Sequence, residues 1–139
     1  MREYIYLIAP LGGWVVAQSI KFVLTLRKDG ITFGDAVQSG GMPSSHTALI
    51  VALTTVIGLE ADITSVAFGI AATVSGIVVY DALGVRRTTG QQTEAIQALA
   101  KTTKTKLGTI DNAKGHTVPE VLGGGAVGIL VGVLLYNFL

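Results

Sequence analysis

Four long apolar stretches constrain the fold of this chain more than any other feature. They cover about 5–26, 47–59, 63–83 and 118–139. A helix needs about 20 apolar residues to cross the hydrocarbon core of a bilayer. The first, third and fourth stretches reach that length. The second reaches it only if its helix begins near Pro43, which predicts a short or tilted span.

The composition agrees with a membrane protein. Half of the residues are hydrophobic and 14% are charged, against roughly 25% in a soluble domain. The length of 139 residues predicts one membrane-embedded domain, 1–139. The absence of cysteine excludes disulfides, thiolate metal sites and a cysteine nucleophile. A cleaved signal peptide is a weaker interpretation of the first stretch, because its apolar run continues past Ala17.

The connections between the stretches differ in character. Only Glu60-Ala61-Asp62 joins the second stretch to the third, which predicts an antiparallel helical hairpin. Residues 84–116 are polar and basic, and apolar side chains recur among polar ones over 91–107. That pattern is typical of an amphipathic helix lying at the membrane interface. We therefore predict an all-α integral-membrane bundle with about four transmembrane helices and an interfacial amphipathic helix.

Basic residues are distributed unevenly between the two sides of this bundle. Eight lie in the first and third connections, against Arg2 alone on the other side. The eight are Arg27, Lys28, Arg86, Arg87, Lys101, Lys104, Lys106 and Lys114. Short cytoplasmic loops carry an excess of lysine and arginine. We therefore expect these two connections to be cytoplasmic and both termini to lie outside.

With this topology, polar residues from all four stretches meet at the cytoplasmic side. Lys21 is near the end of the first stretch, His46 at the start of the second and Asp81 near the end of the third. Glu120 is at the start of the fourth, four residues after His116. Ionisable groups within a membrane are costly and usually line a functional site. The sequence thus predicts a polar site there.

The residue types in this set are suited to phosphoryl transfer. Cations are supplied by Lys21, Arg27, Lys28, Arg86 and Arg87. Arginine forks match phosphate oxygens, and a helix start at the PSSH turn (43–46) suits an anion. Two histidines can act as nucleophile and general acid, and a carboxylate can orient one imidazole. Together these features describe transfer through a phosphohistidine.

Three segments resemble a known family: "GGMPSSHTA", "VVYDALGVRRTTGQQ" and "GHTVPEVLGG". They are similar to the divergent bacterial and plant branch of the type-2 phosphatidic acid phosphatase superfamily, over about 18–125. The superfamily comprises membrane lipid phosphatases, soluble acid phosphatases and vanadium haloperoxidases. The resemblance implies a membrane enzyme that hydrolyses a lipid or isoprenoid phosphate or diphosphate through a phosphohistidine, without a metal or other cofactor. We expect it in the plasma membrane of a prokaryote.

The resemblance also implies roles for individual residues. Ser44 would bind phosphate, His46 would protonate the leaving oxygen, and His116 would be the nucleophile that Glu120 orients. The other substrate-binding residues that we expect are Lys21, Arg27, Ser45, Asp81, Arg86 and Arg87. Two departures from the family pattern stand out. No proline follows Arg27, and Ile110 stands where an arginine is expected, so Arg86 or Arg87 would have to replace it.

Three alternative interpretations stay open. The altered arginine motif favours a non-catalytic phospholipid-binding or structural membrane protein that kept a phosphate pocket. A divalent metal site built from Asp81, His116 and Glu120, with or without His46, has suitable ligands, although the nearby cations oppose it. Residues 117–120 also form a capping-box pattern, and Ser44 or Ser45 a plain helix cap, neither of which requires any chemistry.

The lysines and glycines that remain indicate which partners the chain could bind. The lysines over 101–114 are typical of a surface that attracts anionic headgroups. They lack the interleaved aromatic residues of a nucleic-acid site, so we expect no nucleic acid. Gly124, Gly128 and Gly132 recur at four-residue spacing, which indicates a close helix-packing face. That face would serve either the internal bundle or a homodimer.

Overall fold

A computed structural model describes residues 2–26, 41–105 and 115–139, without the side chains of Arg86 and Arg87. Every regular element in these ranges is helical, which confirms the predicted all-α class. A short 3-10 turn, η1 (Arg2–Tyr4), leads into the first long helix. The long helices are α1 (Ile5–Leu26), α3 (Ser45–Ala61), α4 (Val66–Leu83), α5 (Val85–Thr103) and α6 (Val118–Phe138).

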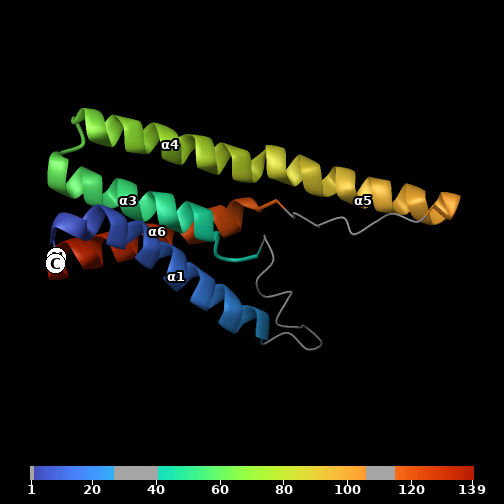
Figure 1. The fold of residues 1–139 in the computed structure, drawn as a ribbon, viewed down its shortest axis with the longest axis horizontal. Helices are drawn as coiled ribbons and strands as arrows, with labels where there is room; N and C mark the ends of the chain where they lie inside the picture. The colour runs from blue at the N-terminus through green and yellow to red at the C-terminus, as the bar shows by residue number, and fades with distance from the viewer. Residues whose placement is uncertain (1, 27–40, 106–114) are drawn as a thin grey trace.

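Helix α3 is the centre of the bundle. It packs against α1, α4 and α6, and α1 also contacts α6 (Figure 1). Glycines allow the close approach of two of these neighbours. A Cβ built on Gly13 of α1 or on Gly128 of α6 would lie 2.7 Å from the same backbone oxygen, that of Ala48. Small residues at such contacts let helix backbones approach closely within a membrane.

The predicted glycine face of α6 is used inside the chain. Gly124 meets the backbone oxygen of Ser44, and a Cβ on Gly132 would lie 2.8 Å from the Cβ of Thr55. These contacts, like that of Gly128, are all with α3. Of the two uses left open for this face, the structure therefore shows internal packing. A homodimer remains a prediction and would need a different surface.

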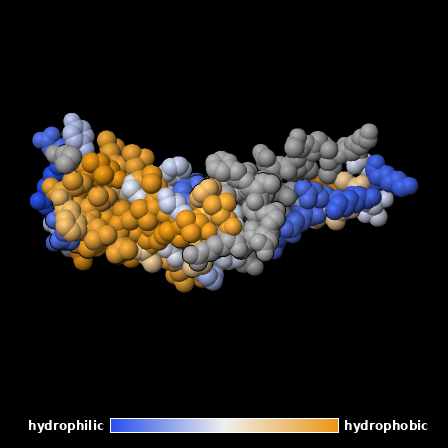
Figure 2. Space-filling model, turned by 90° about the horizontal axis from the view of Figure 1, so that it is seen from below, coloured by the Kyte–Doolittle hydropathy of each residue, from blue (hydrophilic) through white to orange (hydrophobic). Residues whose placement is uncertain are grey.

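The outer surface of the bundle suits contact with lipid. Three helical runs in the described ranges are long and apolar enough to cross a membrane: Arg2–Leu26, Val66–Thr103 and Val118–Phe138. Figure 2 shows a broad hydrophobic band over the bundle, with hydrophilic residues beyond it at both ends of the molecule. Large apolar side chains such as Leu7, Ile77 and Leu122 are more than half exposed.

Helix α3 is shorter than the other spans, as predicted for the second stretch. Its 17 residues cover about 25 Å at 1.5 Å per residue, less than the roughly 30 Å of a bilayer core. The turn before it contains the buried residues Pro43 and Ser44. Non-helical backbone is tolerated at membrane depth where protein covers it. A short central helix is therefore compatible with the bundle.

Helix α5 corrects one boundary of the sequence analysis. We predicted a loop from residue 84 and a helix over 91–107, but α5 already begins at Val85 and ends at Thr103. The helical hydrogen bonds continue across Gly84, whose N–H donates to Tyr80 O at 2.8 Å and whose oxygen accepts from the Thr88 N–H at 3.0 Å. The amphipathic helix is thus present, but it extends α4 in a nearly straight line (Figure 1). Its position at the membrane interface remains a prediction.

Threonine side chains are accommodated within the helix of this polar segment. Thr88, Thr89 and Thr93 each donate a side-chain hydrogen bond to the carbonyl four residues earlier. Such bonds satisfy the hydroxyl without breaking the helix. The apolar side chains of Ile96 and Leu99 stay exposed on α5.

The two chain termini meet at the other end of the bundle. The Arg2 guanidinium lies 3.1 Å from Glu60 Oε2 and 5.2 Å from the centre of the Tyr136 ring. These contacts join the start of η1 to the ends of α3 and α6. The predicted hairpin is also present, because α3 and α4 pack side by side (Figure 1). In the short turn between them, Asp62 Oδ1 accepts the Thr64 N–H at 2.9 Å.

Candidate active site

The PSSH turn forms the start of α3. Ser44 is fully buried and caps the helix, because its Oγ accepts hydrogen bonds from the N–H and the hydroxyl of Thr47 at 3.4 and 3.0 Å. Ser45, also buried, is the first residue of the helix. The plain-cap interpretation of Ser44 is therefore correct as a structural role. A helix start also concentrates N–H groups and positive partial charge, which favours anions nearby.

The starts of α3 and α6 are joined directly. The backbone N–H of Ser44 donates to the backbone oxygen of Glu120 at 2.9 Å. This single bond connects the two segments that carry the predicted catalytic histidines. They are separated by about seventy residues of chain and by two intervening helices.

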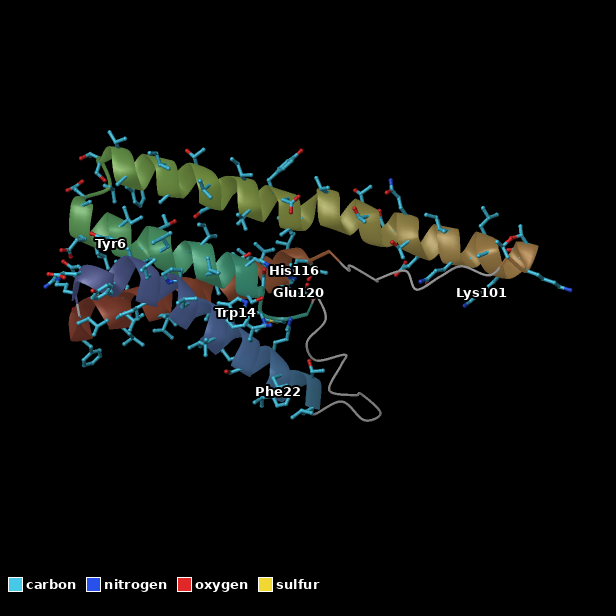
Figure 3. All side chains as sticks on the ribbon, viewed as in Figure 1. Tyr6, Trp14, Phe22, Lys101, His116 and Glu120 are labelled. Atoms are coloured by element: carbon cyan, nitrogen blue, oxygen red, sulfur yellow. The ribbon has the colours of Figure 1, made fainter. Side chains whose placement is uncertain are left out.

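His116, which is buried, and Glu120, which is half-buried, form a pair at the start of α6 (Figure 3). Nδ1 of His116 lies 3.2 Å from Glu120 Oε2, and the His116 residue is only 5% exposed. The same carboxylate oxygen accepts the Thr117 N–H at 2.9 Å. The capping box is thus formed, and Glu120 also contacts the histidine. The two interpretations of this glutamate are compatible, because one oxygen serves both donors.

This pair determines what His116 can do chemically. A carboxylate beside Nδ1 favours the tautomer that carries its proton on that nitrogen. The lone pair of Nε2 is then available, and among the described residues Nε2 has no hydrogen-bond partner. An oriented neutral imidazole with one bare nitrogen is the form that a nucleophilic histidine requires.

The end of α4 also reaches this site. The backbone N–H of His116 donates to the backbone oxygen of Ala82 at 3.1 Å. Asp81, next to Ala82, is half-buried. The segments around residues 44, 82 and 116, which carry the family resemblance, therefore meet in one place.

Lys21 completes the described part of the site from α1. It ends a buried ridge at four-residue spacing, formed by Ile5, Ala9, Gly13, Ala17 and Lys21. Lys21 is only 6% exposed, and its charge interacts electrostatically with Glu120. Its aliphatic stem lies 3.3 Å from the point that a Cβ on Gly41 would occupy, and Gly41 has φ = +88°. Glycine at position 41 thus leaves space for the Lys21 side chain and adopts the positive φ that other residues rarely adopt.

Of the other predicted site residues, the structure describes His46 but not Arg27 or the side chains of Arg86 and Arg87. His46 lies in the first turn of α3 and is exposed, in contrast to the buried His116. Arg27 and Ile110 lie outside the described residues, as do the side chains of Arg86 and Arg87. Their roles stay predictions.

Two contributions were missed by the sequence analysis. Gly41 gives Lys21 its space, and the Ala82 backbone oxygen positions His116. The glycine pair before the PSSH turn was a signal for the first. No local pattern signals the second.

The metal alternative gains no support from the described part of the chain. Within residues 2–26, 41–105 and 115–139, no three histidine or carboxylate side chains gather closely enough to hold a metal ion. The acidic partner of His116 is engaged by the Thr117 N–H instead.

Comparisons with known proteins found a family and a relative. A family model described as "Divergent PAP2 family" matches residues 3–131. The "Uncharacterized membrane protein YuiD" of Bacillus subtilis (strain 168) is 32% identical, over 95% of this chain and 94% of its own. No solved structure matches the chain.

Proposed function

The chain belongs to the divergent PAP2 family of membrane proteins, and on this premise we propose that it hydrolyses a lipid or isoprenoid phosphate or diphosphate through a phosphohistidine. The observation that carries this proposal is the contact between the buried His116, through Nδ1, and Glu120 Oε2 at 3.2 Å. That contact stands beside the start of α3, where an anion is favoured.

The proposed reaction has two steps. His116 Nε2 attacks phosphorus, an N–P bond forms, and the bond from phosphorus to the leaving oxygen breaks. His46 gives a proton to that oxygen, so the lipid leaves as an alcohol or as a shorter phosphate. Water then attacks the phosphohistidine and returns a proton to His46, which releases phosphate and restores both histidines.

Glu120 and Lys21 support the first step. Transfer makes the imidazole cationic, and the neighbouring carboxylate stabilises that charge while it holds the ring in place. Lys21, buried near Glu120, supplies positive charge for the phosphate oxygens. Further contacts are proposed from Ser44, Ser45 and Arg27, and from Asp81, Arg86 and Arg87 at the end of α4. The apolar surface of the bundle would hold the acyl or prenyl chain in the membrane.

Phosphate release by purified protein in lipid nanodiscs tests the proposal. The panel contains phosphatidic acid, lysophosphatidic acid, phosphatidylglycerol phosphate and a prenyl diphosphate, each with and without vanadate. We expect release from at least one lipid and inhibition by vanadate, which mimics the phosphorus centre in transfer. The absence of release from every lipid would contradict the proposed catalysis.

A second candidate function is phospholipid binding without catalysis. It is favoured by Ile110, which stands at the arginine position of the family pattern. Binding of a lipid phosphate without any release of phosphate, in the same nanodiscs, would support this candidate over the enzyme.

Removal of the Glu120 charge gives a prediction about its two roles. Glu120→Gln keeps an oxygen that can accept the Thr117 N–H, but it no longer stabilises an imidazolium. We expect turnover to fall about 10²-fold or more, with little change in melting temperature. Thr117→Ala is the matched control, since it removes the threonine side chain of the capping box and leaves the pair of Glu120 with His116 intact. Equal turnover in both variants would limit Glu120 to capping.

We further propose that the site and α5 face the cytoplasm, where the exposed Lys101 and Lys104 would meet anionic headgroups. Cysteine labelling checks this topology, because the natural chain has no cysteine. Thr103→Cys should resist a membrane-impermeant thiol reagent added to intact cells, and Ala61→Cys should react. Both positions are exposed, so burial does not confound the result. The reverse labelling pattern would overturn the proposed orientation.

A further inference from the structure

Gln18 has an unusual position in α1. Its side-chain oxygen Oε1 is buried and has no hydrogen-bond partner, and it is the one such side-chain atom in the described part of the chain. The neighbouring Ser19 differs, because its hydroxyl donates to the Val15 carbonyl at 2.8 Å. The proposed reaction gives Gln18 no role.

An unpaired acceptor of this kind is costly. A buried polar group without a partner loses its hydration and gains nothing in return. Leucine at this position of an apolar helix would avoid that cost. No described residue supplies a hydrogen-bond donor to Gln18 Oε1, and a bound substrate is one source of such a donor.

The surroundings of Gln18 indicate where that donor comes from. Gln18 precedes Lys21 by three residues, so the two side chains are neighbours on the helix surface. Gln18 also lies between Trp14 and Phe22 at four-residue spacing, and such residues follow one another along one face of a helix. Trp14 is 41% exposed and Phe22 is half-buried. Figure 3 shows both aromatic residues on α1, with His116 and Glu120 at the start of α6.

A lipid phosphate bound at Lys21 would place its first carbon atoms beside Gln18 and its chain along the aromatic residues. A phosphate dianion and an acyl ester offer only acceptors to Oε1. A prenyl chain offers neither donors nor acceptors. The complementary group is a hydroxyl near the phosphate.

We propose that Gln18 determines specificity by accepting a hydrogen bond from such a hydroxyl, so that the preferred substrates are lipid phosphates with a free glycerol hydroxyl. This inference rests on the proposed function. It narrows the substrate class to lysophosphatidic acid, phosphatidylglycerol phosphate and lipids of the same kind. Phosphatidic acid and prenyl diphosphates would be poorer substrates.

A matched pair of lipids tests the inference. One is 1-acyl-glycerol 3-phosphate, and the other is its 2-deoxy analogue with the same acyl chain. We expect kcat/KM of the natural protein to favour the hydroxyl lipid by about tenfold or more, because a site built for a hydroxyl rejects an analogue that lacks it. Gln18→Leu should remove this preference by lowering kcat/KM for the hydroxyl lipid alone. Ser19→Ala is the matched control and should change neither value.

The outcomes separate this inference from the proposed function. Turnover of both lipids without any preference, or an equal loss on both in Gln18→Leu, would overturn the role of Gln18 alone. Hydrolysis of another lipid of the panel, but of neither member of this pair, would also overturn the role of Gln18. If no lipid of the panel is hydrolysed, the proposed catalysis fails, and binding of the two lipids in nanodiscs is compared instead. Tighter binding of the hydroxyl lipid that is lost in Gln18→Leu would then support the role of Gln18. Equal binding would overturn it.

Discussion

Replacement of His116 by alanine is expected to abolish the covalent phosphoenzyme and to lower turnover at least about 10³-fold, as loss of a nucleophile does in other enzymes. The imidazole forms the new bond to phosphorus in the proposed first step, and the chain has no cysteine to replace it. Rapid quenching of a reaction with ³²P-labelled lipid phosphate, at alkaline pH where phosphohistidine survives, measures the intermediate directly.

His46→Ala is the informative control for this experiment. It should still form the phosphoenzyme from substrates with good leaving groups, since these need little protonation. The fold should survive both changes. His116 contacts Ala82 through its backbone N–H, which alanine keeps, and His46 is exposed. Near-normal turnover by His116→Ala would refute the mechanism and leave Glu120 as a capping residue only.

Gly124→Val is expected to have the largest effect on stability. A Cβ on Gly124 would collide with the backbone oxygen of Ser44 and would lie 3.0 Å from the Cβ of Thr47. Backbone cannot move aside as a flexible side chain can, so α6 must separate from α3. We expect a loss of roughly 3 kcal/mol, at the upper end of the usual cost of overpacking. Thermal unfolding in detergent, followed by circular dichroism, measures this loss.

The adjacent glycine provides the control. A Cβ on Gly125 would meet no atom within 4 Å, so Gly125→Val should change the stability by about 0.5 kcal/mol or less, as surface changes usually do. Gly124→Val should also impair any phosphatase activity that the folded fraction retains, because Ser44 and Glu120 are joined at this contact. Equal melting temperatures for the two variants would show that α3 and α6 do not pack as described.

Much of the fold could be predicted from the sequence because the bilayer admits few solutions. A chain in lipid must satisfy its backbone hydrogen bonds within each helix, so apolar length directly indicates a span. The first stretch, 5–26, coincides with α1, and the fourth ends one residue beyond α6. The boundary of α5 was wrong because threonine and glycine suggested a loop. Instead, the backbone hydrogen bonds of α4 continue across Gly84, and the threonine hydroxyls bond to carbonyls within the helix.

The candidate site, too, has features that the sequence predicts and features that only the packing of the helices explains. The sequence alone was enough to pair His116 with Glu120, because both residues match one family motif, although His116 precedes the N-cap Thr117 and lies outside the helix. It also determined the family, through three local motifs. Only the tertiary structure decided that Ser44 bonds to Glu120, that His116 bonds to Ala82, and that the α6 glycines pack on α3. Each of these contacts joins helices far apart in the chain, and which helices meet depends on the packing of the whole bundle, which no local window of sequence contains.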